Sequence, residues 1–303
     1  MKADALRAEI SPSRTDGLAS RLASDFAQLV KARLTLLVLL TTAVGFYLAA
    51  PAPVSFVALF HAVFGTSLAA AGAAALNQWW ERRADSLMER TRIRPIPSGR
   101  MRARDALAIG TVLGVAGVLY LAVLCNRLSA ILAALTIVLY IFAYTPLKRI
   151  STANTLVGAI SGAIPPMVGW AAARGQLNAG AWSLFAILFF WQMPHFFSLA
   201  WMYRADYARA GFQMISSDDE SGARSASQSV LFCILLLMVG GIPGYLGVAS
   251  AIYVPISMAL SGSFIAVAMH FHKQRSARAA RWLFLASITY LPLLLLTLVA
   301  TKL

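Results

Sequence analysis

The chain has 303 residues, of which 59% are hydrophobic and only 13% are charged. Soluble globular proteins are about 45–50% apolar and about 25% charged, so this composition excludes a soluble enzyme or a soluble binding module. The formal net charge of +14 would suggest a nucleic-acid partner for a soluble protein. No such partner is expected here, because the basic residues follow the distribution of a membrane protein, as shown below.

The first thirty residues are polar and contain both acids and arginines. They lack a short apolar region followed by a small-residue cleavage site, so a cleaved signal peptide is not expected. We predict a cytoplasmic tail over 1–30, which leads into a short interfacial helix at about 18–33. Residues 31–303 are predicted to form a single polytopic domain, because the connections between their apolar segments are too short for another domain.

Nine apolar segments are long enough to cross a bilayer as helices, which takes about 17–25 residues. They cover 34–50, 54–76, 105–125, 128–146, 153–173, 180–200, 229–248, 250–270 and 282–300. With the N-terminus inside, 23 Lys and Arg residues lie on the inner side, and only Arg127, Arg174 and Lys302 lie outside. The positive-inside rule therefore predicts an all-α membrane protein with nine transmembrane helices, its N-terminus inside and its C-terminus outside.

A polar stripe follows the second apolar segment, at the inner edge of the membrane. Asn77, Glu81 and Asp85 recur every four residues, so on a helix they share one face. Their oxygen atoms are suitable ligands for a hard divalent cation. A single charge at this place is often only the polar end of a helix, but three oxygen-bearing side chains on one face favour a functional site.

Arginines interleave with this stripe and follow it, and eight lie within 77–104. Arg90, Arg92 and Arg94 come soon after the last acid of the stripe, and guanidinium groups bind phosphate in a bidentate manner. Acid oxygens beside them at a membrane edge suggest a site for a lipid diphosphate. Lys148 and Arg149, after the fourth segment, either neutralise a departing diphosphate or serve only as topology determinants.

The fifth segment contains Pro165 and Pro166, which must distort a helix. Irregular backbone inside a bilayer is tolerated only where protein or a cavity satisfies it. The distortion is either a packing kink or the wall of a cavity large enough for a bulky substrate.

Further candidates lie in and after the sixth segment. Asp206 is the second candidate metal ligand, on the same side as the stripe. His195, close to the inner end of the sixth segment, is a candidate for substrate contact or proton handling, with an interhelical hydrogen bond as the alternative. His61 lies within the second segment, where a lone histidine is more typical of an interhelical hydrogen bond than of a ligand.

Together these motifs resemble those of the UbiA superfamily of intramembrane prenyltransferases. The similarity extends over 31–35, 77–100, 144–149, 162–170, 191–196 and 206–214. The Arg-Thr-Arg-x-Arg-Pro, Trp-Gln-x-Pro-His-Phe and Asp-Tyr-x2-Ala-Gly blocks are similar to the haem branch of the superfamily rather than to its quinone branches. Glu81 departs from the usual aspartate, and Ala205 stands where a second acid is common.

The resemblance implies transfer of a farnesyl group from farnesyl diphosphate to the vinyl group of haem b, giving haem O. It implies Mg²⁺, or Mn²⁺ in its place, held by Asn77, Glu81, Asp85 and Asp206. The diphosphate would be bound by Arg90, Arg92, Arg94, Lys148 and Arg149, and haem b, a substrate rather than a cofactor, by His61, His195 and Tyr207. The residues expected to carry the catalysis are Asn77, Glu81, Asp85, Lys148, His195 and Asp206.

The resemblance also implies a multi-pass protein of the bacterial inner membrane, with its active site on the cytoplasmic face. The expected partners are the two substrates, the bilayer, and haem A synthase or oxidase assembly factors. Two other functions remain open: a prenyltransferase that acts on an aromatic quinone precursor, and a transporter, which also uses broken helices. The clustering of charge on one face and the odd number of segments favour an enzyme over a transporter.

Overall fold

The computed structural model describes residues 17–303, and the part of the predicted tail over 1–16 lies outside them. The described residues form helices and one isolated β-bridge between Ala249 and Lys302. The helices are α1 (Leu18–Leu29), α2 (Ala32–Ala49), α3 (Phe56–Asp85), α4 (Ala103–Leu124), α5 (Arg127–Val138), the π-helix η2 (Leu139–Tyr144), α6 (Thr145–Leu147), α7 (Asn154–Ala163), α8 (Pro165–Arg174), α9 (Ala179–Met202), α10 (Arg204–Arg209), α11 (Ala223–Gly240), α12 (Ile242–Tyr245), α13 (Tyr253–Gln274) and α14 (Ala277–Ala300).

Nine stretches of the described chain are helices long and apolar enough to cross a membrane. They are Ala32–Ala49, Phe56–Asp85, Ala103–Leu124, Arg127–Leu147, Asn154–Arg174, Ala179–Met202, Ala223–Tyr245, Tyr253–Gln274 and Ala277–Ala300. Each corresponds to one predicted segment, so the prediction of a nine-helix membrane protein is confirmed. The orientation of the bundle and the division of the chain at residue 30 stay predictions.

The second span is longer than its apolar segment. It was predicted over 54–76, but α3 has 30 residues and continues to Asp85. The helix can continue because its last polar side chains find partners within the protein. Gln78, for example, donates hydrogen bonds to the backbone oxygens of Gln28 and Leu29 at the end of α1. The polar stripe therefore lies on a membrane-spanning helix and not in a loop.

The fourth and fifth spans are irregular, and the irregularity of the fifth span is the one that the sequence predicts. The fifth span is broken at Ile164, because Pro165 and Pro166 have no N–H to continue the hydrogen bonding of α7. The second half, α8, lies so close to α2 that a Cβ at Gly169 would collide with the carbonyl oxygen of Thr42. The fourth span contains the π-helix η2 before its last turn, α6, and the apolar pattern does not predict this π-helix.

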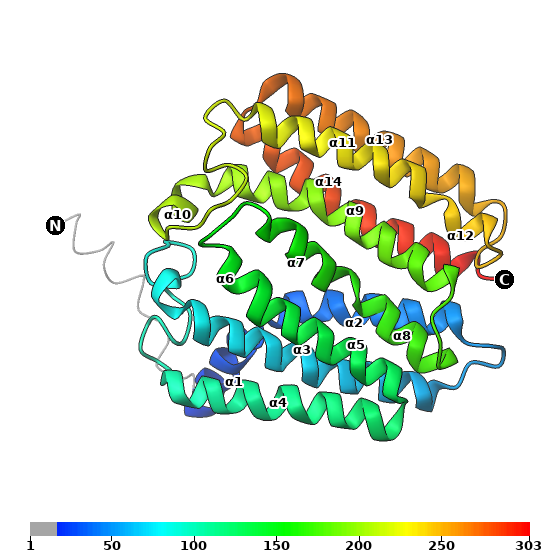
Figure 1. Cartoon of the computed structure of the whole chain (residues 1–303), viewed down its shortest axis with the longest axis horizontal. Helices are drawn as coiled ribbons and strands as arrows, with labels where there is room; N and C mark the ends of the chain where they lie inside the picture. Colours follow the sequence, from blue (N-terminus) through cyan, green and yellow to red (C-terminus); the bar gives the residue numbers. More distant parts are fainter. Residues whose placement is uncertain (1–16) are drawn as a thin grey trace.

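The long helices lie alongside one another in a single bundle (Figure 1). The segment over 86–102, α6 and α10 gather at one end of the bundle, whereas α12 and the C-terminus lie at the other end. A buried cluster that includes Met88, Ala159, Met193 and Phe212 packs beneath the first of these ends. Residues distant in sequence are therefore held together where α3 ends.

Candidate functional site

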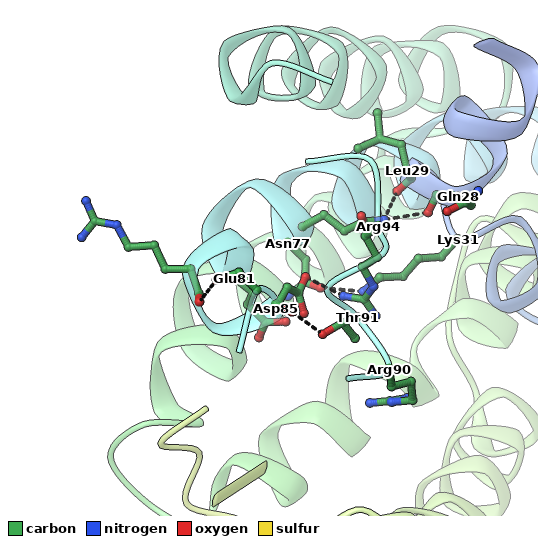
Figure 2. Close-up of polar contacts among 12 residues, drawn as sticks. Gln28, Leu29, Lys31, Asn77, Glu81, Asp85, Arg90, Thr91 and Arg94 are labelled. Atoms are coloured by element: carbon green, nitrogen blue, oxygen red, sulfur yellow. Dashed lines mark hydrogen bonds and ion pairs between the residues drawn. The ribbon is translucent and has the colours of Figure 1, made fainter. Parts of the chain in front are cut away.

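The polar stripe of α3 points into the protein. Asn77, Glu81 and Asp85 are all buried, with exposed fractions of 0%, 7% and 1%. Figure 2 shows them along one side of α3, with Lys31 and Arg94 reaching toward them from other segments. The prediction that the three residues share one face is confirmed, and burial of two carboxylates requires partners of opposite charge.

Each residue of the stripe is bound by one basic side chain. Lys31 Nζ lies 2.6 Å from Asn77 Oδ1, and Lys148 Nζ lies 2.6 Å from Glu81 Oε1. An Arg94 guanidinium nitrogen lies 2.7 Å from Asp85 Oδ2. The three cations come from the α1–α2 junction, the end of α6 and the segment after α3, so three parts of the chain meet at the stripe.

Lys31 is a site residue that the sequence analysis did not select. It lies between α1 and α2 in the left-handed conformation, with φ of 49°. Its ammonium group also lies 3.3 Å from the hydroxyl oxygen of Tyr140, and that hydroxyl donates a hydrogen bond to Asn77. The amide nitrogen of Asn77 donates to the hydroxyl of Thr145. A lysine just before the first span was visible in the sequence, but its proximity to the stripe depends on the fold.

Aromatic side chains flank Lys148 at the end of α6. Its ammonium group lies 4.4 Å from the ring centre of Tyr144 and 5.5 Å from that of Phe212, and its backbone oxygen accepts a hydrogen bond from Gln213. Burial would lower the pKa of Lys148, but the Glu81 carboxylate outweighs burial and holds that pKa above its ordinary value. Lys148 is therefore a permanent cation.

The segment after α3 folds back over the stripe. The hydroxyl of Thr91 donates to the backbone oxygen of Asp85, which fixes the turn that presents Arg94. Arg90 is exposed and lies 4.8 Å from the ring centre of Tyr203, and it donates a long hydrogen bond of 3.4 Å to the Tyr207 hydroxyl. Arg92 and Arg149 are exposed, and neither side chain makes a hydrogen bond or ion pair with another described residue.

The structure does not bring Asp206 into the stripe. Its carboxylate forms an ion pair with Arg209 in the same short helix, α10. Across residues 17–303, no three acidic, histidine or cysteine side chains lie close enough together to hold a metal ion. A four-ligand set made of the stripe and Asp206 is therefore not formed in this arrangement of the side chains.

One atom of the stripe nevertheless fits a metal ion. Asp85 Oδ1 is buried and has no hydrogen-bond partner among the described residues, although Asp85 Oδ2 is bound by Arg94. A buried carboxylate oxygen without a partner is unfavourable, and a cation would satisfy it. Mg²⁺ usually takes only one or two carboxylates from the protein and completes its shell with water and substrate phosphates. The donor set of the stripe suits such an ion.

The charge of the site favours an anion as the ligand. Three cations, Lys31, Lys148 and Arg94, face only two carboxylates. Burial, together with Arg94, lowers the pKa of Lys31 from 10.5 to about 7, even though Glu81 and Asp85 act in the opposite direction. An anion bound here would favour the charged form of Lys31.

The two candidate histidines lie away from the stripe. His195 Nδ1 lies 2.8 Å from Ser287 Oγ on α14, and no hydrogen bond or ion pair within 17–303 joins His195 to Asp206. His61 Nδ1 lies 2.7 Å from the hydroxyl oxygen of Tyr120 on α4. Both histidines therefore link neighbouring helices, as the alternative interpretation of each predicted.

A family model matches most of the chain. The UbiA prenyltransferase family model matches residues 38–289. A protein of Solibacter usitatus named protoheme IX farnesyltransferase is 42% identical over 279 residues, which cover 89% of this chain and 96% of the relative.

Two solved structures share the fold. One, described as digeranylgeranylglyceryl phosphate synthase, has a TM-score of 0.77 at 12% identity and covers 92% of this chain and 98% of its own. The other is a UbiA homologue from Archaeoglobus fulgidus bound to DMAPP and Mg²⁺, with a TM-score of 0.66 at 13% identity, covering 91% of this chain and 99% of its own. At these identities the likeness concerns the fold alone.

Proposed function

The chain belongs to the UbiA prenyltransferase family, and we propose that it transfers a farnesyl group from farnesyl diphosphate to a vinyl group of haem b, producing haem O. Relatives named protoheme IX farnesyltransferase, with about two fifths of their residues identical over almost the whole chain, support this donor and this acceptor. The structural observation that supports a site for a metal ion and a diphosphate is the buried, unpartnered Asp85 Oδ1 among basic side chains.

We propose that Asn77, Glu81 and Asp85 hold Mg²⁺, for which Mn²⁺ would substitute. The chemistry that the ion supplies when bound is charge neutralisation of the leaving diphosphate. Asp206 is proposed as a further ligand, which requires its release from Arg209. The structure of an archaeal homologue with DMAPP and Mg²⁺ supports a metal-dependent prenyltransferase.

Lys31, Arg94 and Lys148 are proposed to move from the stripe to the diphosphate. Each now binds one residue of the stripe at 2.6–2.7 Å. A diphosphate carries more negative charge than the two carboxylates, so an arriving diphosphate would attract all three cations and free the oxygens of the stripe. Fixed positive charge is then present where the leaving group becomes more negative, which lowers the barrier to cleavage of the carbon–oxygen bond.

The exposed arginines are proposed to contribute at the entrance. Arg90 lies over the Tyr203 and Tyr207 rings, while Arg92 and Arg149 are solvent-exposed near the same end. Their charge would attract the anionic substrate by steering and not through a fixed contact. Tyr207 lies at this entrance and is proposed to bind haem b.

The proposed reaction breaks one carbon–oxygen bond and forms one carbon–carbon bond and one carbon–oxygen bond. The bond between C1 of the farnesyl group and the diphosphate oxygen breaks, and diphosphate leaves. The vinyl carbon of haem b forms a new carbon–carbon bond to C1, which moves the positive charge to the carbon next to the ring. Water adds there and loses a proton, leaving a hydroxyl group. Exclusion of bulk water from C1 is required, because water would otherwise capture the allylic cation first.

The active site is proposed to face the cytoplasm of a bacterial inner membrane. In the predicted topology 23 basic residues lie on the inner side and 3 on the outer side, and the stripe lies at the inner end of the second span. The product is membrane-bound, so transfer to haem A synthase or to oxidase assembly factors is proposed to occur within the membrane.

Turnover by the purified full-length protein tests the proposal. We expect incubation with haem b, farnesyl diphosphate and Mg²⁺ to yield haem carrying one farnesyl and one hydroxyl group, detected by mass spectrometry. A parallel reaction would offer an aromatic quinone precursor in place of haem b. Farnesylation of that precursor and not of haem b would overturn the proposal that haem is the acceptor, but it would leave the prenyltransferase activity intact. Absence of any diphosphate release with either acceptor would overturn both.

A further inference from the structure

We propose that His195 Nε2 binds the iron of the acceptor haem, and that Ser287 selects the tautomer that makes this possible. The inference rests on the proposed function, because it assumes that haem is the acceptor. It assigns a role to a histidine that lies away from the stripe, and to a serine that no sequence motif indicated.

The hydrogen bonds of Ser287 determine which ring nitrogen of His195 carries the proton. The Ser287 hydroxyl donates to the backbone oxygen of Phe284 at 2.6 Å. A hydroxyl group has one proton, so the same oxygen can only accept from His195 Nδ1, which lies 2.8 Å away. Nδ1 is then the protonated nitrogen. In a neutral imidazole this leaves Nε2 with a free lone pair, as a metal ligand requires.

This arrangement is the usual one for a histidine that binds a metal. Such a histidine donates its other ring N–H to a neighbouring acceptor, which fixes the tautomer and the orientation of the ring. Haem iron is commonly bound by histidine in this way. In the described residues Nε2 has no hydrogen-bond partner, and the His195 side chain is only partly buried, so the nitrogen is not occupied by another group.

Aromatic residues hold the imidazole in place. The Trp191 ring stacks on it at 5.5 Å between centres and 27° between planes, and Phe284 lies at 4.9 Å. Trp191 Nε1 donates a hydrogen bond to the backbone oxygen of Ser287, so Trp191 and His195 are both bound to Ser287 on α14. A ring in contact on both sides loses little freedom when it binds iron.

The position of His195 also separates the group that would anchor the haem iron from the groups that would anchor the diphosphate. Met193 and Phe197, two residues before and after it, pack into the cluster beneath the stripe, whereas His195 contacts α14. Successive helical residues turn by about 100°, so His195 lies on a different side of α9 from these two. The iron is thereby assigned to His195 on α9, while the diphosphate is assigned to the stripe of α3.

Titration of the detergent-solubilised full-length protein with ferric haem tests the inference. We expect the wild-type protein to show the Soret band and EPR signal of a histidine-bound haem. His195→Ala should weaken haem binding at least 10-fold and lose this signature, and added imidazole should restore it. Ser287→Ala should keep the signature but weaken binding about 10-fold, because loss of an outer hydrogen bond to a ligand typically costs 10–100-fold. His270→Ala, on the exposed face of α13, serves as the matched control and should match wild type.

His195→Gln guards against a folding defect, because the amide can still donate to Ser287 but does not replace imidazole as an iron ligand. A His195→Gln protein with wild-type thermal stability and an unchanged haem spectrum would overturn the inference. Wild-type protein that farnesylates haem without a nitrogen-ligand signature would also overturn it, and would leave the proposed function intact. Wild-type protein that neither binds nor farnesylates haem would overturn the proposed function itself.

Discussion

Replacement of Asp85 by asparagine separates the role of its two oxygen atoms. Asp85 Oδ2 is bound by Arg94 at 2.7 Å, whereas Oδ1 is buried without a partner. In Asp85→Asn the side chain keeps its size, and one oxygen remains to accept from Arg94. The negative charge is lost, however, and with it the affinity of the free oxygen for a cation. The variant therefore removes the proposed metal ligand while it preserves the packing of α3.

Two effects are expected, one on stability and one on turnover. The hydrogen bond to Arg94 changes from a charged pair, worth about 1.5–3 kcal/mol, to one with a neutral acceptor, so the free energy of unfolding should fall by about 1–2 kcal/mol. Loss of one group that stabilises transition-state charge typically costs about 2.7–4 kcal/mol in the barrier. We therefore expect turnover to fall by about 10²–10³-fold in a protein that remains folded. Asp85→Ala would be harder to interpret, because it also leaves Arg94 without its partner.

The assay is haem farnesylation over a range of Mg²⁺ concentrations, with thermal unfolding measured on the same samples. Asp105→Asn is the matched control, because Asp105 is half-exposed in a surface ion pair with Arg104 at the start of α4. That variant should keep wild-type turnover and stability. Wild-type turnover of Asp85→Asn at saturating Mg²⁺ would show that the stripe is not the metal site.

Three further outcomes are expected. Lys148→Ala and Arg94→Lys should each raise the KM for farnesyl diphosphate at least 10-fold and leave the haem affinity unchanged. Lys148→Ala removes a cation, and in Arg94→Lys an ammonium group cannot reproduce a bidentate guanidinium contact. Equal losses of affinity for the two substrates would indicate a folding defect. Gly169→Ala should lower thermal stability, because its Cβ would meet the Thr42 carbonyl oxygen. Gly262→Ala should leave thermal stability unchanged, because there is open space around the added Cβ. Equal stability of the two variants would contradict the close contact of α2 and α8. A reporter domain fused after Leu303 should be located outside the cytoplasm. A cytoplasmic location of this reporter would refute the topology.

The fold was predictable because its main signals are local. Each transmembrane helix corresponds to an apolar segment, and the break at Ile164 follows from two prolines that cannot donate hydrogen bonds. The continuation of α3 to Asp85 was not predicted, because a composition boundary marks where apolar sequence ends and not where the helix ends. The helix extends because α1 supplies acceptors for Gln78, and that is a tertiary contact.

The site was predictable only in part, for the same reason. The four-residue spacing was sufficient to place Asn77, Glu81 and Asp85 on one face, because that relation lies within a single helix. Lys31 is 46 residues away from its partner Asn77, and no sequence period connects them. The pairing of Asp206 with Arg209 likewise depends on how α10 folds, so a sequence-based ligand set could not anticipate it.

The contacts of the stripe explain how one set of side chains can serve both a protein without ligands and a protein with a bound diphosphate. Two buried carboxylates would be unstable alone, and the basic residues neutralise them. The same basic residues are the ones that a diphosphate needs, and the carboxylates they release are the ones that a divalent cation needs. Binding of metal and diphosphate together therefore exchanges partners without leaving a charge unpaired. Either ligand alone would separate charges that are now paired, so this arrangement favours joint binding of the two.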